Sequence, residues 1–277
     1  MALLTLYRHG LTAGTPPSVN NHQRALRGDC EGWTVKSTRG NTQFLRSVSE
    51  RSLDGYGYAV TLTLRHCPYS HEVWHSMRTT FIKRLARMGM VRLHWLTEWQ
   101  RRGVPHLHSA VWFGNPVDPR SIVDAWLAVA KDYEPNSRSQ NVVEITDSVG
   151  WFKYLAKHAV RGAGHYQRSS ESIPPGWKKT GRMWGKSGTW KLEEPIRINL
   201  RPDGYYAFRR IVKGWRLAQA KADTTDSRKY RVRSAKNMLV TTDEYLGRVR
   251  GVSEWINHDL QEQILTFMAA AGYSVES

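Results

Sequence analysis

The chain is poor in cysteine and in long apolar runs. Only Cys30 and Cys67 occur among 277 residues, with no Cys-x-x-Cys pair, so the sequence offers no disulfide framework, zinc knuckle or dithiol redox motif. No run of about 18 apolar residues could cross a membrane, and the opening MALLTLYRHG lacks the basic lead and apolar length of a signal peptide. These absences predict a soluble protein of a reducing cytoplasm with no membrane partner.

Acidic residues are scarce relative to basic ones. Lys and Arg number 41 against 24 Asp and Glu, which gives a formal net charge of +17 and a pI of about 10.1. Such a charge favours an anionic partner, most often nucleic acid. A solubility charge or a membrane-surface patch is the alternative, but the excess is spread along the chain rather than held in one amphipathic helix. The 12 Trp and 12 Tyr include rings on which single-stranded bases could stack, beside those that fill the core.

Local patterns divide the chain into three parts. Residues 1–55 are rich in Gly, Ser, Thr, Asn and Arg, show no persistent period, and are predicted to be irregular. Residues 56–190 are predicted to form one folded domain, and residues 191–277 a basic, mostly helical C-terminal region. Between Arg209 and Arg250 there are 12 Lys or Arg and 4 Asp or Glu, which makes this region the candidate for gripping duplex nucleic acid.

The central part carries the clearest secondary-structure signals. Alternating apolar residues predict strands at 58–64, 91–99, 106–113 and 141–145. Helical periodicity predicts helices at about 70–88, 119–131 and 147–160. This order is typical of an α+β, ferredoxin-like domain, an antiparallel sheet of about four or five strands with helices packed on one face. We expect the other face to be free for a site.

Two histidines share one face of a predicted strand. His106 and His108 are two residues apart, a spacing at which strand side chains project from the same side. Glu98 lies near the end of the preceding strand, so pairing across the short turn would bring its carboxylate close to the imidazoles if it faces the same side of the sheet. A His-x-His pair alone is more often structural. With Glu98 it forms a nitrogen and carboxylate set that suits Mn²⁺ or Mg²⁺ better than structural zinc.

Tyr154 and Lys157 are three residues apart on the predicted helix 147–160 and are therefore neighbours on its surface. The apolar stripe of this helix lies on the opposite side, so Tyr154 is not placed like a core aromatic residue. A phenol, with a pKa near 10, needs positive charge nearby to attack at neutral pH, and Lys157 could supply it. An amphipathic surface tyrosine without a chemical role is the alternative.

Together, these residues resemble the HUH endonuclease superfamily, in particular the rolling-circle replication initiators of single-stranded DNA phages and plasmids. The strand at 60–64 is similar to the opening motif of that family. Glu98 with the segment GVPHLH at 103–108 resembles its metal motif, and YLAK at 154–157 resembles its Tyr-x-x-Lys nucleophile motif. The segment GRMWG at 181–185 is similar to an element of phage-type members. The likeness covers about residues 58–190.

The resemblance implies a metal-dependent nickase that acts on single-stranded or hairpin origin DNA. It implies that His106, His108 and Glu98 hold Mn²⁺ or Mg²⁺, and that Tyr154 attacks the scissile phosphate while Lys157 steadies the developing charge. The products would be a 5′-phosphotyrosine and a free 3′-hydroxyl. A host helicase and polymerase are the expected partners, and the oligomeric state is left open. Because the nucleophile follows the metal motif, a plasmid-mobilising relaxase is disfavoured.

The sequence also departs from the family pattern. Many phage members carry a second tyrosine on the nucleophile helix, whereas the next tyrosine here is Tyr166, so closure of the circle by Tyr166 or by a second protomer is left open. The segment 181–187 is one residue short of a phosphate-binding loop and predicts no ATP site. A single-tyrosine transposase and a non-catalytic DNA-binding protein are the alternatives, and an RNA-processing nuclease, which would have no use for Tyr154, is a weaker third.

Overall fold

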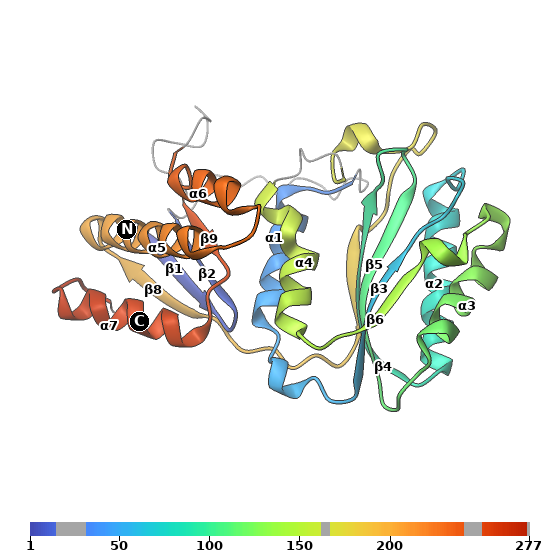
Figure 1. Ribbon diagram of the computed structural model, residues 1–277, viewed down its shortest axis with the longest axis horizontal. Coiled ribbons are helices and arrows are strands. Elements are labelled where there is room, and N and C mark those ends of the chain that lie inside the picture. The colour runs from blue at the N-terminus through green and yellow to red at the C-terminus, as the bar shows by residue number, and fades with distance from the viewer. Residues whose placement is uncertain (15–31, 162–166, 241–250, 276–277) are drawn as a thin grey trace, which may run out of the picture. The chain divides into compact units, whose positions relative to one another are not determined.

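A computed structural model describes residues 1–14, 32–161, 167–240 and 251–275, without the side chains of residues 157–161. The chain forms two compact units. The central unit comprises Ala25–Leu192, and the terminal unit combines Met1–Arg24 with Glu193–Ser277. Each unit contains one antiparallel sheet (Figure 1).

The central unit is built on a five-stranded sheet in the order β6-β3-β5-β4-β7, and each neighbouring pair is antiparallel. The predicted strands and the helices between them follow the ferredoxin-like order, which confirms the α+β fold class. The fifth strand, β7, lies in a Gly-rich segment for which no strand is predicted. The strands are β3 (Tyr56–Leu62), β4 (Met90–Trp99), β5 (Pro105–Phe113), β6 (Asn141–Glu144) and β7 (Trp184–Gly188).

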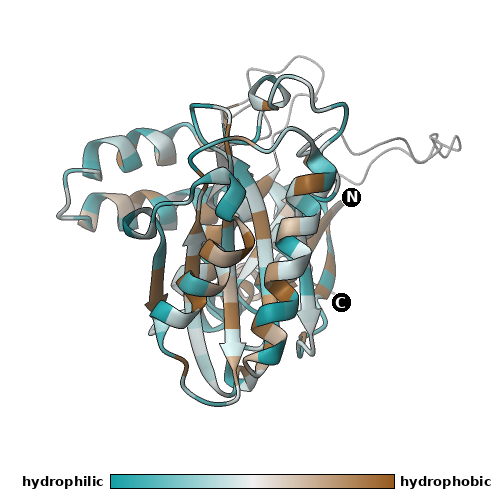
Figure 2. Cartoon of the chain, turned by 90° about the vertical axis from the view of Figure 1, so that its right-hand side faces the viewer, coloured by the Kyte–Doolittle hydropathy of each residue, from teal (hydrophilic) through white to brown (hydrophobic). Residues whose placement is uncertain are grey.

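One face of this sheet is covered by α2 (His71–Arg87) and α3 (Pro119–Val129). As predicted, α2 begins after the N-cap Ser70, whose side chain accepts a backbone hydrogen bond from its first turn. Trp74 of α2 and Trp126 of α3 are both buried and meet edge to face with their ring centroids 5.8 Å apart. Figure 2 views this face and shows hydrophilic and hydrophobic residues alternating along both helices, as expected of helices with one buried side.

The opposite face of the sheet is covered by α1 (Val35–Ser47) and α4 (Ser148–Arg161) (Figure 1). The expectation that this face is free of helices is therefore wrong. The physical reason is that it also carries large rings that need cover. Phe44 of α1 stacks on the buried His94 ring with centroids 5.6 Å apart, and Phe152 of α4 packs near Trp112 at 6.2 Å.

The prediction that residues 1–55 are irregular is wrong for much of that segment. Besides α1, it contains β1 (Ala2–Tyr7) and β2 (Gly10–Gly14), a hairpin in the middle of the second sheet. That sheet has the order β8-β1-β2-β9, with β8 (Ile196–Leu200) and β9 (Val252–Glu254) on the outside. Two strands this short show too little alternation to be recognised alone, and they are stabilised by pairing with strands from the far end of the chain.

The described part of the terminal unit also contains the helices α5 (Pro202–Ala222), α6 (Arg228–Lys236) and α7 (His258–Ala270). Side chains of α5 and α7 form one buried apolar cluster with the sheet, and its most buried members are Leu4, Leu11, Leu200, Val212 and Met268. The C-terminal region is thus largely helical, as predicted, but it forms a unit with the N-terminal hairpin.

Short 3-10 helices lie at Glu50–Ser52, Lys131–Tyr133, Ser137–Ser139 and Ser170–Ser172. Within the described ranges, no helix combines the length and the apolar character needed to span a bilayer.

Candidate active site

The hairpin of β4 and β5 brings the three residues of the predicted metal set together. Glu98 is paired directly with His106, and the next pair on that side is Leu96 with His108, so all three functional side chains project from one face of the sheet. The imidazole rings of His106 and His108 are neighbours, with centroids 4.5 Å apart. Nε2 of His108 lies 3.5 Å from Oε2 of Glu98. The register of a single hairpin produces this cluster.

His108 is buried and is oriented by the neighbouring strand. Thr61 of β3 lies directly opposite His108, and its hydroxyl oxygen is 3.0 Å from Nδ1 of the ring. When Nδ1–H donates to that hydroxyl, the lone pair of Nε2 faces Glu98. This is the tautomer that a metal-binding histidine needs, with a hydrogen bond on the other ring nitrogen to hold it.

His106 is partly exposed and has a different partner. The amide nitrogen of Gln100 is 2.8 Å from Nδ1 of His106, and the amide oxygen of Gln100 accepts a hydrogen bond of 2.9 Å from Nε of Arg102. With the amide in this orientation, Nδ1 of His106 accepts a hydrogen bond and a neutral ring carries its proton on Nε2. Binding of a metal through Nε2 of His106 therefore requires the Gln100 amide to turn over.

Arg168 is a residue of this site that sequence reasoning missed. Its side chain is fully buried, and both Nε and Nη2 lie 3.1 Å from Oε1 of Glu98. Nη2 also donates to the carbonyl of Leu155 in α4, and the guanidinium lies 3.9 Å from the centroid of the Trp33 ring. Burial lowers the pKa of Arg168 and the carboxylate of Glu98 offsets part of that shift. No motif marks Arg168, since its role depends on contacts with residues distant in sequence.

Tyr154 lies on the sheet-facing side of α4, next to the histidines. Its ring meets that of His108 edge to face with centroids 5.5 Å apart, and it stacks on Trp151 at 4.6 Å with an angle of 10° between the planes. The indole N–H of Trp151 donates to the carbonyl of Ser109 in β5, which ties α4 to the strand that carries the histidines. The predicted nucleophile is thus in contact with the predicted metal site.

The described surroundings of Tyr154 raise its pKa rather than lower it. Burial and the negative charge of Glu98 raise the pKa of Tyr154 above its ordinary value, so its hydroxyl is protonated at neutral pH. Lys157, the predicted activating charge, lies in α4, but its side chain is outside the described residues. Its role stays a prediction, as does that of Tyr166, which is outside them altogether.

The donor atoms fit a divalent ion in part. Two ligands at about 2.1 Å from one ion and at right angles are roughly 3.0 Å apart, close to the 3.5 Å between His108 and Glu98. The carboxylate of Glu98 suits Mn²⁺ or Mg²⁺, whereas imidazole is the more usual ligand of Zn²⁺, Fe²⁺ or Ni²⁺. Among the described residues, however, no three His, Cys, Asp or Glu side chains already converge on one metal position. Coordination by all three residues would require side-chain rotation, and the metal stays a prediction.

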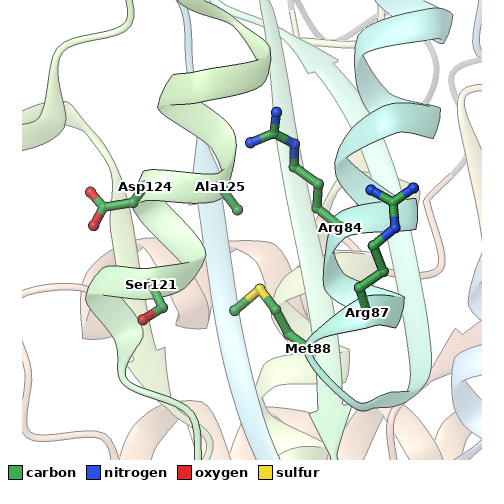
Figure 3. Close-up of a pocket in the computed structure, with 6 residues that line it drawn as sticks. All are labelled: Arg84, Arg87, Met88, Ser121, Asp124 and Ala125. Carbon is green, nitrogen blue, oxygen red and sulfur yellow. The ribbon is translucent and has the colours of Figure 1, made fainter.

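An open pocket of about 480 Å³ lies elsewhere in the central unit, between α2 and α3 (Figure 3). Because these helices cover the face of the sheet opposite the histidines, the pocket is separate from the cluster around His108. Figure 3 shows Arg84 and Arg87 on α2, with Asp124 turned away from them on α3. The six lining residues are Arg84, Arg87, Met88, Ser121, Asp124 and Ala125.

Fold and site together define an α+β protein whose ferredoxin-like sheet carries a cluster of His, Glu and Tyr side chains. No family model and no solved structure matches the chain. It is 45% identical, over the full length of both chains, to a protein of Xylella fastidiosa strain 9a5c named provisionally as a replication protein. A similarly named protein of strain Temecula1 is 48% identical over 92% of this chain and 99% of its own.

The third relative is a phage protein. A replication-associated protein of Pseudomonas phage Pf3 is 45% identical over 99% of each chain. With this identity and coverage, the chain belongs to the family of replication-associated proteins that includes this protein of phage Pf3.

Proposed function

We propose that this chain is a metal-dependent endonuclease that nicks and rejoins one DNA strand at an origin and thereby initiates rolling-circle replication. Membership of a replication-associated family supports a role in initiation. The observation that carries the chemistry is the contact between the Tyr154 ring and His108, whose Nε2 faces the carboxylate of Glu98. A nucleophile beside a candidate metal site is the arrangement that phosphodiester transesterification needs.

In the proposed reaction, the Tyr154 hydroxyl oxygen attacks the phosphorus of the scissile phosphodiester. The bond from phosphorus to the 3′-oxygen breaks, which leaves a 5′-phosphotyrosine. The phenol loses its proton to solvent, and the departing 3′-oxygen takes up one proton from solvent, so the step balances and ends in a 3′-hydroxyl. A host polymerase can extend this 3′-hydroxyl while a host helicase opens the duplex. Attack by a 3′-hydroxyl on the phosphotyrosine reverses the step and rejoins the strand.

The surrounding residues have separate proposed roles. A divalent ion held by His106, His108 and Glu98 would polarise the scissile phosphate and supply positive charge beside Tyr154. Trp151 holds the Tyr154 ring by stacking, and Thr61 orients His108. Lys157 is proposed to stabilise the charge that develops on the phosphate.

The decisive experiment uses labelled single-stranded DNA from the protein's own replicon with Mn²⁺, Mg²⁺ or EDTA, followed by denaturing electrophoresis. We expect the wild-type protein to retain label covalently in either metal and to lose this activity in EDTA. Tyr154→Phe should form no covalent product. Tyr69→Phe is the matched control, because Tyr69 is 76% exposed and distant in sequence from the site, and it should behave as wild type.

The other outcomes separate the alternatives. Cutting by Tyr154→Phe at the wild-type rate would exclude Tyr154 as the nucleophile and direct attention to Tyr166→Phe. Specific DNA binding without cutting by any protein would support a non-catalytic DNA-binding protein. Cleavage confined to mobile-element ends, with none at an origin, would favour a single-tyrosine transposase.

A further inference from the structure

The helix α6 has an unusual charge distribution. Its sequence RKYRVRSAK contains five Lys or Arg and no acidic residue, and Ala235 is its one buried side chain. Such a helix gains little from packing of an apolar face. Two of its cations have local partners. Arg231 pairs with Asp223 at 2.8 Å, and Nε of Arg228 donates to the carbonyl of Lys221, so both fix α6 to the end of α5.

The remaining three cations, Lys229, Arg233 and Lys236, form what we call the α6 stripe. They are spaced at i, i+4 and i+7, which places them along one side of the helix. All three are exposed, and no ion pair in the described part of the chain includes any of them. With a rise of 1.5 Å per residue, they extend over roughly 10 Å.

Helix stability alone does not account for the α6 stripe. The pairs Lys229 with Arg233 and Arg233 with Lys236 place like charges at the spacings where side chains meet, which destabilises a helix. Cations near the C-terminus complement the helix dipole, but Lys229 lies in the first turn, where the dipole disfavours positive charge. A regular array of anions alongside the helix would offset both effects.

We propose that the α6 stripe binds the phosphate backbone of duplex DNA. Phosphates of one strand follow each other every 3.4 Å along a duplex axis, so the stripe spans about three of them. Arg228 and Arg231 anchor α6 to the end of α5, so the three cations of the α6 stripe keep a fixed spacing. A fixed spacing suits the regular array of phosphates along a duplex. This inference rests on the proposed function, which identifies the bound DNA as the double-stranded flank of the origin. The central unit would act on the single strand.

The test measures binding of the full-length protein to a duplex and to a single strand of equal length over a series of salt concentrations. Neutralising the stripe by Lys229→Gln, Arg233→Gln and Lys236→Gln should make the slope of log K against log salt shallower by about 2.7 on the duplex. The control, Lys131→Gln with Arg197→Gln and Arg201→Gln, removes the same charge from exposed residues outside the segment 209–250 and should change the slope by less than about 1. Lys229→Arg with Lys236→Arg should keep the wild-type slope.

Three outcomes would overturn the proposal: an unchanged duplex slope, an equal change in the control, or a change confined to the single strand. Nicking of a short single-stranded origin fragment, measured in parallel, should be the same in the stripe variant and the wild type. If neither the wild type nor any variant nicks DNA, the proposed function fails. The salt dependence of duplex binding would still decide the role of α6.

Discussion

Both units of this protein bury apolar side chains, but most of the buried charged side chains lie in the central unit. The central unit buries Arg78, His94, Glu98, His108 and Arg168, and it holds them with hydrogen bonds and aromatic rings around a sheet covered on both faces. The terminal unit buries a mainly apolar cluster between its sheet and two helices, and leaves the cations of α6 exposed. Buried polar groups are costly unless they are paired, so their concentration in the central unit favours that unit as the place of the proposed chemistry. Exposed cations on an apolar scaffold are suited to holding phosphates.

The largest expected effect comes from breaking the buried ion pair of the central unit. Arg168→Ala leaves the carboxylate of Glu98 buried without its guanidinium partner and should lower the free energy of unfolding by about 3 to 5 kcal/mol. Adding Glu98→Gln should recover part of that loss. Arg65→Ala is the control, because its pair with Glu134 is mostly exposed and should contribute less than about 1 kcal/mol. Urea denaturation of the wild type and the three variants measures these free energies of unfolding. An equal loss of stability in Arg168→Ala and Arg65→Ala would refute the difference between the buried and the exposed ion pair.

A smaller effect tests the core of the terminal unit. Leu4 in β1 is fully buried in the apolar cluster, so Leu4→Ala should cost about 2 to 5 kcal/mol. The neighbouring Leu3 is only partly buried, and Leu3→Ala should cost less than about 1 kcal/mol. If both variants unfold at the same denaturant concentration as wild type, β1 does not contribute to the core.

The smallest effect depends on pH and concerns His94. Burial, with help from the charges of Arg168 and Lys186, lowers the pKa of His94 to about 3, against about 6.5 in the unfolded chain. Between pH 3 and pH 6.5, His94 is therefore protonated in the unfolded chain but neutral in the folded protein. The contribution of neutral His94 is therefore complete above pH 6.5 and is lost as the pH falls toward 3, with a slope of up to about 1.4 kcal/mol per pH unit.

Denaturation between pH 7 and pH 5 measures this slope. His94→Gln removes the titrating group and should flatten the decline, whereas His66→Gln, at a side chain 58% exposed, should leave it unchanged. A decline of equal steepness in wild type and His94→Gln would show that other groups control the acid sensitivity.

Much of the central unit could be predicted because its signals are local. The alternation along β4 and β5 and the short turn between them predict an antiparallel hairpin, and the structure adds the register that pairs Glu98 with His106. The N-cap Ser70 and the period of α2 define that helix to within a residue or two. The apolar stripe of α4 correctly places Phe152 in the core, but it does not reveal that Tyr154, outside that stripe, also contacts the sheet through His108.

The rest of the site could not be predicted in this way. Arg168 reaches Glu98 from 70 positions away in sequence, and Thr61 reaches His108 from 47. Nothing in the local pattern around either residue distinguishes it from a surface arginine or an ordinary strand threonine. The hairpin of β1 and β2 was missed for the same reason, since its partners β8 and β9 lie near the other end of the chain.

The sequence by itself determined the fold class, the shared face of His106 and His108 and the strong positive charge, because these follow from periodicities of a few residues and from composition. Only the tertiary structure decided that α1 and α4 cover the face of the sheet that carries the site, that Arg168 neutralises Glu98 and that the pKa of Tyr154 is raised. Those properties depend on burial and on charges brought close by long-range packing, and neither is encoded in the spacing of neighbouring residues.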